Sequence, residues 1–225
     1  MSATDLSGFE LRLRNARDPL ALDSALAGSA RAKAQETREI STRFFDAEAE
    51  NLVVMARALS DVWRDGGRVF AMGLGAAGSE AARFAIQFQH PSVAGRRSLT
   101  AVNLAGDAAM VSAVAAEAGF DHVFAHQLAA RACPGDGLIG FCIGSETPSL
   151  MAAFVEAKQR RVVTFGFACG HGGKMRTSGL VDHCLVAPTA SAARAQECHL
   201  AAVHVLGDLV HSILADDPGP LEAEH

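Results

Sequence analysis

The chain contains no tyrosine, and Trp63 is its only tryptophan, so aromatic residues make up just 6% of the 225 residues. Apolar residues still account for 49%, so a core of ordinary size has to be built mainly from Ala, Val, Leu and Phe. No apolar run reaches the roughly 20 residues of a membrane-spanning helix, and the first residues lack the basic and apolar parts of a signal peptide. The sequence therefore predicts a cytoplasmic protein with no membrane partner.

An excess of positive charge is missing too. There are 20 Lys and Arg residues against 25 Asp and Glu, which gives a net charge of −5. Such a chain offers no electrostatic reason to expect a nucleic acid as a partner. The five cysteines are odd in number and never form a C-x-x-C motif, so reduced thiols are the simplest interpretation.

Strand and helix patterns alternate after a long N-terminal helical segment. The apolar stripe predicts a helix from about residue 31 to residue 64, ended by Gly66-Gly67. Beyond it, short buried strands alternate with helices, which predicts an α/β three-layer sandwich with a parallel sheet covered on both faces. We expect three parts: a helical arm over 1–64, an α/β domain over 65–215 and a disordered acidic tail over 216–225. Strands are predicted near 68–72, 98–104, 137–143, 161–167 and 184–186.

The glycines at 73, 75 and 78 form a turn between the first predicted strand and the helix that follows. The first N–H groups of a helix have no partner inside it, so such a turn can bind an anion. The spacing also reads G-x-G-x-x-G, as in dinucleotide sites, but those need a carboxylate at the end of the second strand. The nearest carboxylate, Asp107, comes too late. A tight turn without a ligand is therefore favoured over a nicotinamide or flavin site.

Five segments taken together resemble the sugar isomerase (SIS) domain family, and within it the phosphoheptose isomerase group. They occur in the family's order and at close to its spacing. The resemblance implies a five-stranded parallel sheet of flavodoxin-like topology between helices. It also implies a sugar phosphate as ligand and a homo-oligomer, tetramer or dimer, with sites at subunit interfaces. The segments are Gly73–Ser79, Ala118–Phe124, Pro134–Gly140, Gly172–Met175 and Ala193–His204.

Aldose–ketose isomerisation needs a base for a carbon-bound proton and an acid that moves a proton between two oxygens. The resemblance assigns these roles to a Glu position occupied here by Gln87 and to a His position occupied by His204. An amide cannot act as a general base near neutral pH, whereas a histidine can. Of the predicted catalytic pair, Gln87 and His204, only His204 can therefore transfer a proton.

Some members of the group bind zinc, and the matching positions here are Arg83, Gln87, Gln196 and His204. Arginine is not a zinc ligand and amides are poor ones, so we expect neither zinc nor another cofactor. His199 lies five residues before His204, and on a straight helix the two rings point in different directions.

The phosphate contacts implied by the resemblance are altered as well. The second loop keeps hydroxyl groups nearby, but Glu146 places a negative charge where a dianion would lie. Arg83 could supply a compensating charge from the first-loop helix. Asp107 matches a pocket-lining position, although a helix N-cap is at least as good an interpretation. The expected substrate-binding residues are Gly75, Ala76, Ser79, Arg83, Asp107, Ser145, Thr147 and Gln196.

Three functions remain open at this point. The first is a phosphosugar aldose–ketose isomerase with a degenerate catalytic site, acting on sedoheptulose 7-phosphate or a related compound. The second is a non-catalytic member of the fold, like the relative that serves as an adaptor for the replication initiator protein. The third is an enzyme or binder for another sugar derivative.

Overall fold

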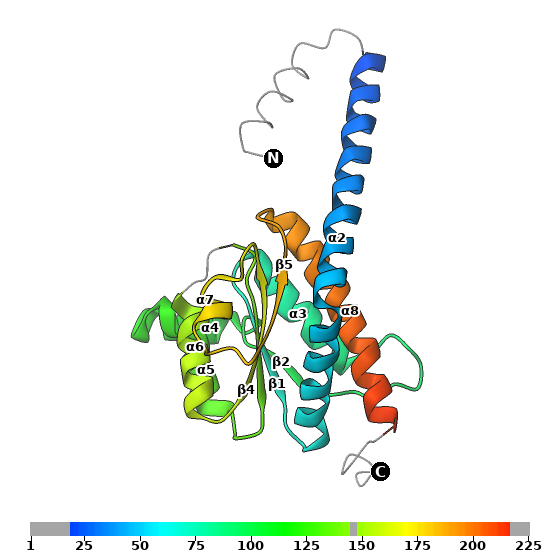
Figure 1. The fold of residues 1–225 in the computed structure, drawn as a ribbon. Coiled ribbons are helices and arrows are strands. Elements are labelled where there is room, and N and C mark those ends of the chain that lie inside the picture. Colours follow the sequence, from blue (N-terminus) through cyan, green and yellow to red (C-terminus); the bar gives the residue numbers. More distant parts are fainter. Residues whose placement is uncertain (1–18, 145–147, 217–225) are drawn as a thin grey trace. The chain divides into compact units, whose positions relative to one another are not determined.

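The computed structural model describes residues 19–144 and 148–216. The chain divides into two compact units between Glu39 and Ile40. This division falls inside helix α2, which spans Pro19–Arg64 (Figure 1). The predicted boundary after residue 64 coincides with the end of α2, but the second half of this helix contributes buried side chains to the α/β unit. The predicted tail from residue 217 onward and residues 1–18 lie outside the described residues.

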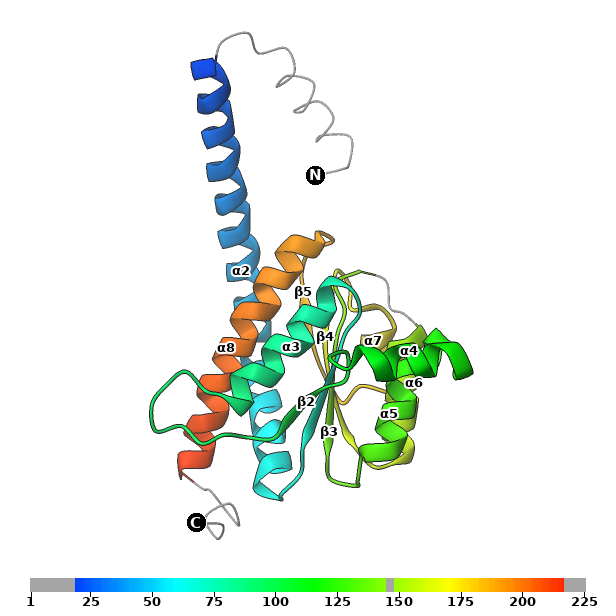
Figure 2. The same cartoon turned by 180° about the vertical axis from the view of Figure 1, so that it is seen from behind.

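The second unit is built on a sheet of five parallel strands in the order β2-β1-β3-β4-β5 (Figure 2). This confirms the predicted α/β fold with its five-stranded parallel sheet and flavodoxin-like strand order. The strands are β1 Val69–Met72, β2 Ala101–Asn103, β3 Gly137–Phe141, β4 Val163–Cys169 and β5 His183–Ala187.

Helices cover both faces of the sheet, as Figures 1 and 2 show. The part of α2 after residue 40 packs with α3 and α8 on one face, and α4 to α7 pack on the other. We call these the α3/α8 face and the α5/α6 face. The helices are α3 Ala76–Gln89, α4 Ala108–Ala118, the 3-10 turn η1 Phe120–His122, α5 Val123–Arg131, α6 Pro148–Gln159, α7 Gly173–Thr177 and α8 Ala192–Asp216.

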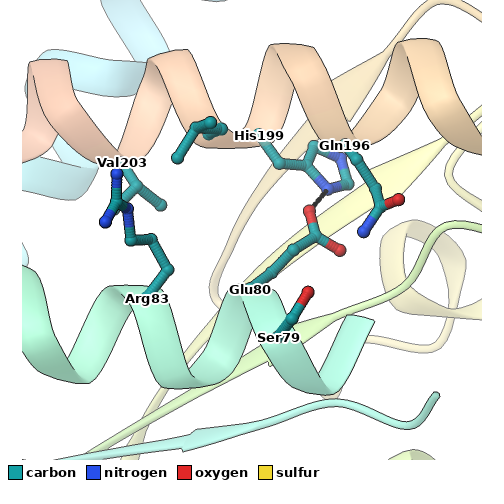
Figure 3. Close-up of a pocket in the computed structure, with 7 residues that line it drawn as sticks. Ser79, Glu80, Arg83, Gln196, His199 and Val203 are labelled. Atoms are coloured by element: carbon teal, nitrogen blue, oxygen red, sulfur yellow. Dashed lines mark hydrogen bonds and ion pairs between the residues drawn. The ribbon is translucent and has the colours of Figure 1, made fainter. Parts of the chain in front are cut away.

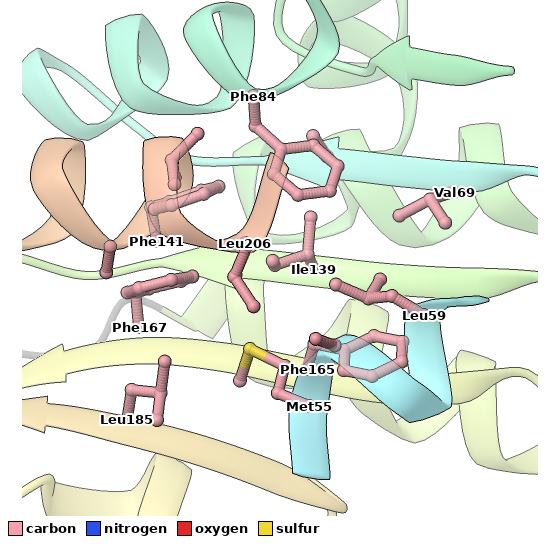
Figure 4. Close-up of a cluster of buried hydrophobic side chains, with 14 of the residues drawn as sticks. Met55, Leu59, Val69, Phe84, Ile139, Phe141, Phe165, Phe167, Leu185 and Leu206 are labelled. Carbon is pink, nitrogen blue, oxygen red and sulfur yellow. The ribbon is translucent and has the colours of Figure 1, made fainter. Parts of the chain in front are cut away.

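Side chains alternate along the strands and thereby divide the core into two clusters. On β1, Val69 and Ala71 belong to the α3/α8 face, whereas Phe70 and Met72 belong to the α5/α6 face. Stacked phenylalanines on β3 and β4, Phe141 and Phe167, lie in the first cluster with ring centroids 5.0 Å apart (Figure 4). With no tyrosine available, phenylalanine supplies most of the large aromatic contacts in this core.

Helix α8 is long and apolar enough to cross a membrane by length and composition alone. About 44% of its most apolar window is buried inside the fold, and that buried side packs in the α3/α8 cluster. The same test is passed by core helices, so it is weak evidence for a membrane span. None of the five cysteines forms a disulfide.

Candidate functional site

A cavity of about 240 Å³ lies between α3 and α8, next to the glycine turn that follows β1 (Figure 3). Ligands of open parallel sheets bind beyond the carboxyl ends of the strands, and this cavity has that position. Its volume is just below the range of about 300–1,000 Å³ typical of drug-sized ligands, so it suits a small molecule or part of one. The lining residues are Ser79, Glu80, Arg83, Gln196, His199, Leu200 and Val203.

Two glycines of the turn have different structural reasons: close packing at Gly73 and a positive φ at Gly75. A Cβ at Gly73 would lie 2.3 Å from the carbonyl oxygen of Ala77. Gly75 has a φ of 57° and precedes α3 without a side-chain cap. The N–H groups of Ala77 and Gly78 donate within the turn, to Leu74 and Gly75. Two of the N–H groups expected to face an anion are therefore already used.

The carbonyl oxygen of Ala76 joins the turn to α8. It accepts a hydrogen bond from the Ser79 hydroxyl at 2.6 Å and another from the Gln196 side-chain amide at 3.2 Å. These two side chains, from helices far apart in sequence, therefore meet over the start of α3. The structure brings three predicted residues, Ser79, Arg83 and Gln196, into one cavity.

Glu80 and His199 form a buried pair in the same cavity, and sequence reasoning did not select either of them. Glu80 is 7% exposed and His199 is 0% exposed. Nδ1 of His199 lies 2.8 Å from Oε1 of Glu80, and its Nε2 lies 3.0 Å from the carbonyl oxygen of Ala168. A helical signal was available, since His199 lies three residues after Gln196 and Glu80 three residues before Arg83.

The remaining groups in the cavity are of three kinds: a carboxylate, a guanidinium and apolar side chains. Oε2 of Glu80 is buried and has no hydrogen-bond partner among the described residues. The Arg83 side chain is exposed and makes no hydrogen bond or ion pair with any described residue. Leu200 and Val203 supply an apolar wall. Figure 3 shows Arg83 rising beside Val203, while Glu80, Ser79 and Gln196 cluster farther along.

The predicted catalytic pair lies outside the residues that line this cavity. Gln87 is half-buried, and its side-chain nitrogen would be 2.6 Å from a Cβ built at Gly207. His204 is exposed, whereas His199 is fully buried, so the two rings do point in different directions. Neither Gln87 nor His204 makes a side-chain hydrogen bond with the part of the chain that the structure describes.

The other predicted binding residues are placed as follows. Gly75 and Ala76 are exposed in the turn. The Asp107 carboxylate accepts a hydrogen bond from the N–H of Met110 at 3.0 Å and so caps the start of α4. Ser145 and Thr147 lie outside the described residues.

The positions that resemble a zinc site do not have suitable donors. Arg83 carries a guanidinium, and Gln87 and Gln196 carry amides, which leaves His204 as the one good ligand of the four. Within residues 19–144 and 148–216, no three or more His, Cys, Asp or Glu side chains gather closely enough to hold a metal ion. The residues present therefore do not fit a zinc ion at this place.

Comparisons with known proteins agree with this architecture. A family model described as "SIS domain" matches residues 34–169. Phosphoheptose isomerase of Chlorobaculum tepidum is 34% identical over 173 residues, covering 76% of this chain and 82% of that protein. Phosphoheptose isomerase of Roseiflexus sp. strain RS-1 is 30% identical over 182 residues, covering 80% and 90%.

Solved structures show the same fold. Phosphoheptose isomerase from Neisseria gonorrhoeae superposes with a TM-score of 0.77 at 25% identity, covering 83% of this chain and 99% of the other. A phosphoheptose isomerase from Francisella tularensis superposes with a TM-score of 0.78 at 24% identity, covering 83% and 98%. Both solved chains are thus matched over nearly their whole length.

Proposed function

Starting from the fact that this chain belongs to the SIS domain family, we propose that it binds a sugar phosphate in the cavity between α3 and α8. The relatives named phosphoheptose isomerase, at 30–34% identity, confirm the resemblance drawn from the sequence and make sedoheptulose 7-phosphate the first compound to test. The observation that supports this proposal most directly is that Ser79, Arg83 and Gln196 line one cavity beside the glycine turn.

The isomerase activity itself is proposed to be weak. Gln87 cannot take a proton from carbon, and its amide contacts α8 near Gly207 instead of lining the cavity. His204 is exposed and retains its capacity for proton transfer. A chain with one functional member of the pair is expected to lose most of the 10²- to 10⁴-fold that general acid–base catalysis typically contributes.

Turnover of sedoheptulose 7-phosphate by the purified protein tests this proposal. We expect slow isomerisation that His204→Ala abolishes and that Gln87→Glu raises. His126→Ala, an exposed histidine on α5, is the matched control and should leave the rate unchanged. Fast wild-type turnover would contradict the degenerate site, and turnover that survives His204→Ala would contradict the role of His204.

A non-catalytic function is the alternative, and Gln87 is the observation that favours it. A protein of this fold without the base could act as an adaptor or regulator, like the relative that associates with the replication initiator, or could bind another sugar derivative. Thermal shift assays with millimolar sugar phosphates separate these cases. A shift without turnover favours a binding protein, and no shift with any sugar phosphate contradicts phosphosugar binding altogether.

Three further properties belong to this proposal. The first is the absence of a zinc requirement, because the donors at the matching positions are unsuitable; elemental analysis of purified protein should find no stoichiometric zinc. The second is assembly into a dimer or tetramer, supported by exposed apolar side chains such as Val53 and Val54 on α2 and measured by light scattering. The third is a cytoplasmic location, tested by cell fractionation.

A further inference from the structure

The hydrogen-bond partners of His199 fix where its protons lie. The Ala168 carbonyl oxygen, 3.0 Å from Nε2, can only accept, so Nε2 carries a hydrogen. Nδ1 and Oε1 of Glu80 are 2.8 Å apart, a distance that requires a proton between them. The pair is either an imidazolium with a carboxylate or a neutral ring with a carboxylic acid. In both forms, Glu80 is held in one orientation by a ring that is itself anchored to the sheet.

This orientation leaves Oε2 of Glu80 without a partner, although the side chain is 93% buried. A buried carboxylate oxygen without a hydrogen bond is costly, so each one calls for an explanation. Gln127 Oε1 and Glu197 Oε2 are also buried without a partner among the described residues, but neither residue lines this cavity. The nearby Ser79 hydroxyl has a single hydrogen and donates it to the Ala76 carbonyl. The Gln196 amide donates to the same carbonyl, and neither its second N–H nor the Arg83 guanidinium makes a hydrogen bond with Oε2. Oε2 therefore has no donor among the described residues.

The surroundings of Oε2 limit what that donor can be. Within the described residues, no group of three or more His, Cys, Asp or Glu is available to hold a metal ion, which disfavours a cation. Leu200 and Val203 form an apolar wall that suits the C–H face of a sugar. Arg83, one helical turn beyond Glu80 on α3, presents a guanidinium not engaged by any described residue, and it suits an anionic group.

We infer that Glu80 is a specificity-determining residue of this cavity: its Oε2 accepts a hydrogen bond from a hydroxyl of the ligand, while Arg83 takes the ligand's anionic group. His199 is a positioning residue that acts through Glu80. The ligand class is a polyhydroxy compound with one anionic group. This inference rests on the proposed sugar-phosphate function and adds that recognition depends on a hydroxyl as well as on the phosphate.

Calorimetric titration with two probes, sedoheptulose 7-phosphate and inorganic phosphate, tests the inference. Glu80→Gln removes the charge that strengthens the hydrogen bond, so sedoheptulose 7-phosphate should bind about 10- to 100-fold more weakly. Inorganic phosphate should bind as in the wild type, because it does not need Glu80. Arg83→Ala should weaken both probes, and Glu117→Gln, an exposed carboxylate on α4, is the matched control and should change neither.

The outcomes separate the two proposals. If the wild type binds sedoheptulose 7-phosphate and Glu80→Gln binds it equally well, the inference is overturned and the proposed function stands. If the wild type binds no sugar phosphate, both are overturned. A merely structural Glu80 would weaken both probes alike, which also overturns the inference.

A second measurement covers the case in which Glu80→Gln does not fold. The wild-type protein is titrated with ribose 5-phosphate, 2-deoxyribose 5-phosphate and inorganic phosphate. If hydroxyl recognition contributes to binding, ribose 5-phosphate binds at least about 10-fold more tightly than inorganic phosphate, and removing a hydroxyl reduces that advantage. Equal affinity for all three compounds would contradict the inference without use of any variant.

Discussion

The two faces of the sheet are built from similar apolar clusters but differ in their buried polar groups. On the α5/α6 face, Gln127 donates to two backbone carbonyls, those of Leu104 and Val123, each at 2.9 Å. Ser149 donates to the carbonyl of Phe120 at 3.0 Å. These side chains join neighbouring elements by satisfying the backbone. On the α3/α8 face, a titratable pair, Glu80 and His199, borders a cavity instead.

This difference distinguishes buried polar side chains that stabilise the fold from a buried pair that lines the candidate site. The Gln127 nitrogen and the Ser149 hydroxyl satisfy backbone carbonyls, which the fold alone accounts for. Oε1 of Gln127 is nevertheless buried without a partner among the described residues, as Oε2 of Glu80 is. The Glu80 carboxylate differs from these groups because it can carry a charge, is oriented by a histidine and belongs to a residue that lines a cavity. The comparison indicates that one layer of this sandwich mainly supports the sheet, while the other both supports it and carries the candidate site.

Truncation of core side chains should have the largest effect on the free energy of unfolding, and this effect should be similar on the two faces of the sheet. Phe165 lies fully buried on the α3/α8 face, and Phe154 lies fully buried on the α5/α6 face. Truncating either to Ala should lower the free energy of unfolding by about 3–5 kcal/mol, because each leaves a cavity in a closely packed core. Urea denaturation of the wild type and both variants measures the loss in free energy of unfolding. A loss below 1 kcal/mol for one of the two would show that its cluster repacks easily, and the faces would then differ in rigidity.

Replacing the buried polar residue on each face should destabilise the protein to different extents. His199→Ala removes the one hydrogen-bond partner that the Glu80 side chain has among the described residues, so the free energy of unfolding should fall by about 3 kcal/mol. Gln127→Leu on the other face should cost about 1 kcal/mol, since it leaves neutral carbonyls without one donor. The double variant Glu80→Ala/His199→Ala should lose less than the sum of the single losses, because the two residues share one interaction. Additive losses would contradict the pair.

Two glycines of the α3/α8 face are expected to differ in their tolerance of a methyl group. Gly73→Ala would place Cβ 2.3 Å from the backbone oxygen of Ala77, and we expect a loss of about 1–3 kcal/mol or more from the forced backbone shift. Gly207→Ala meets the far end of the Gln87 side chain, which can move away, and should cost well under 1 kcal/mol. Thermal unfolding of both variants measures the difference. A larger loss for Gly207→Ala would show that Gln87 is held rigidly.

The smallest expected effect concerns a second histidine on this face. His183 on β5 stacks on Phe165, with ring centroids 5.4 Å apart. Burial lowers the pKa of His183 below its usual 6.5, against the opposing charge of Asp182. The unfolded chain therefore binds the proton more readily, and the stability contributed by neutral His183 is present above about pH 6.5 and lost as the pH falls below it.

Unfolding free energies of the wild type and His183→Gln at pH 7.5 and pH 5.5 measure this contribution. The wild type should lose more stability than the variant between these two values, and the difference between the proteins isolates His183 from the other titrating groups. An identical pH dependence would mean that the ring is protonated as easily in the folded protein as in the unfolded chain.

Most of the fold could be predicted from the sequence because its signals are local. Alternating apolar strands and helices give the parallel sheet, and Gly73 and Gly75 mark the turn after the first strand. Ser79 and Arg83 could be placed near this turn because they follow it directly along α3. Gln196 could be placed there only through the resemblance, since α8 lies more than 100 residues away.

What the tertiary structure decided is which polar side chains share a cavity. Glu80 and His199 are 119 residues apart, and no local pattern says that α3 and α8 will bring them within 2.8 Å of each other. Conversely, Gln87 and His204 occupy promising sequence positions but do not line the cavity. Gln87 lies one helical turn beyond Arg83, against α8 near Gly207, and His204 is exposed on α8. The sequence by itself therefore determined the sheet, the turn and the family, because these depend on neighbours along the chain. Only the packing of two distant helices decided which carboxylate faces the cavity.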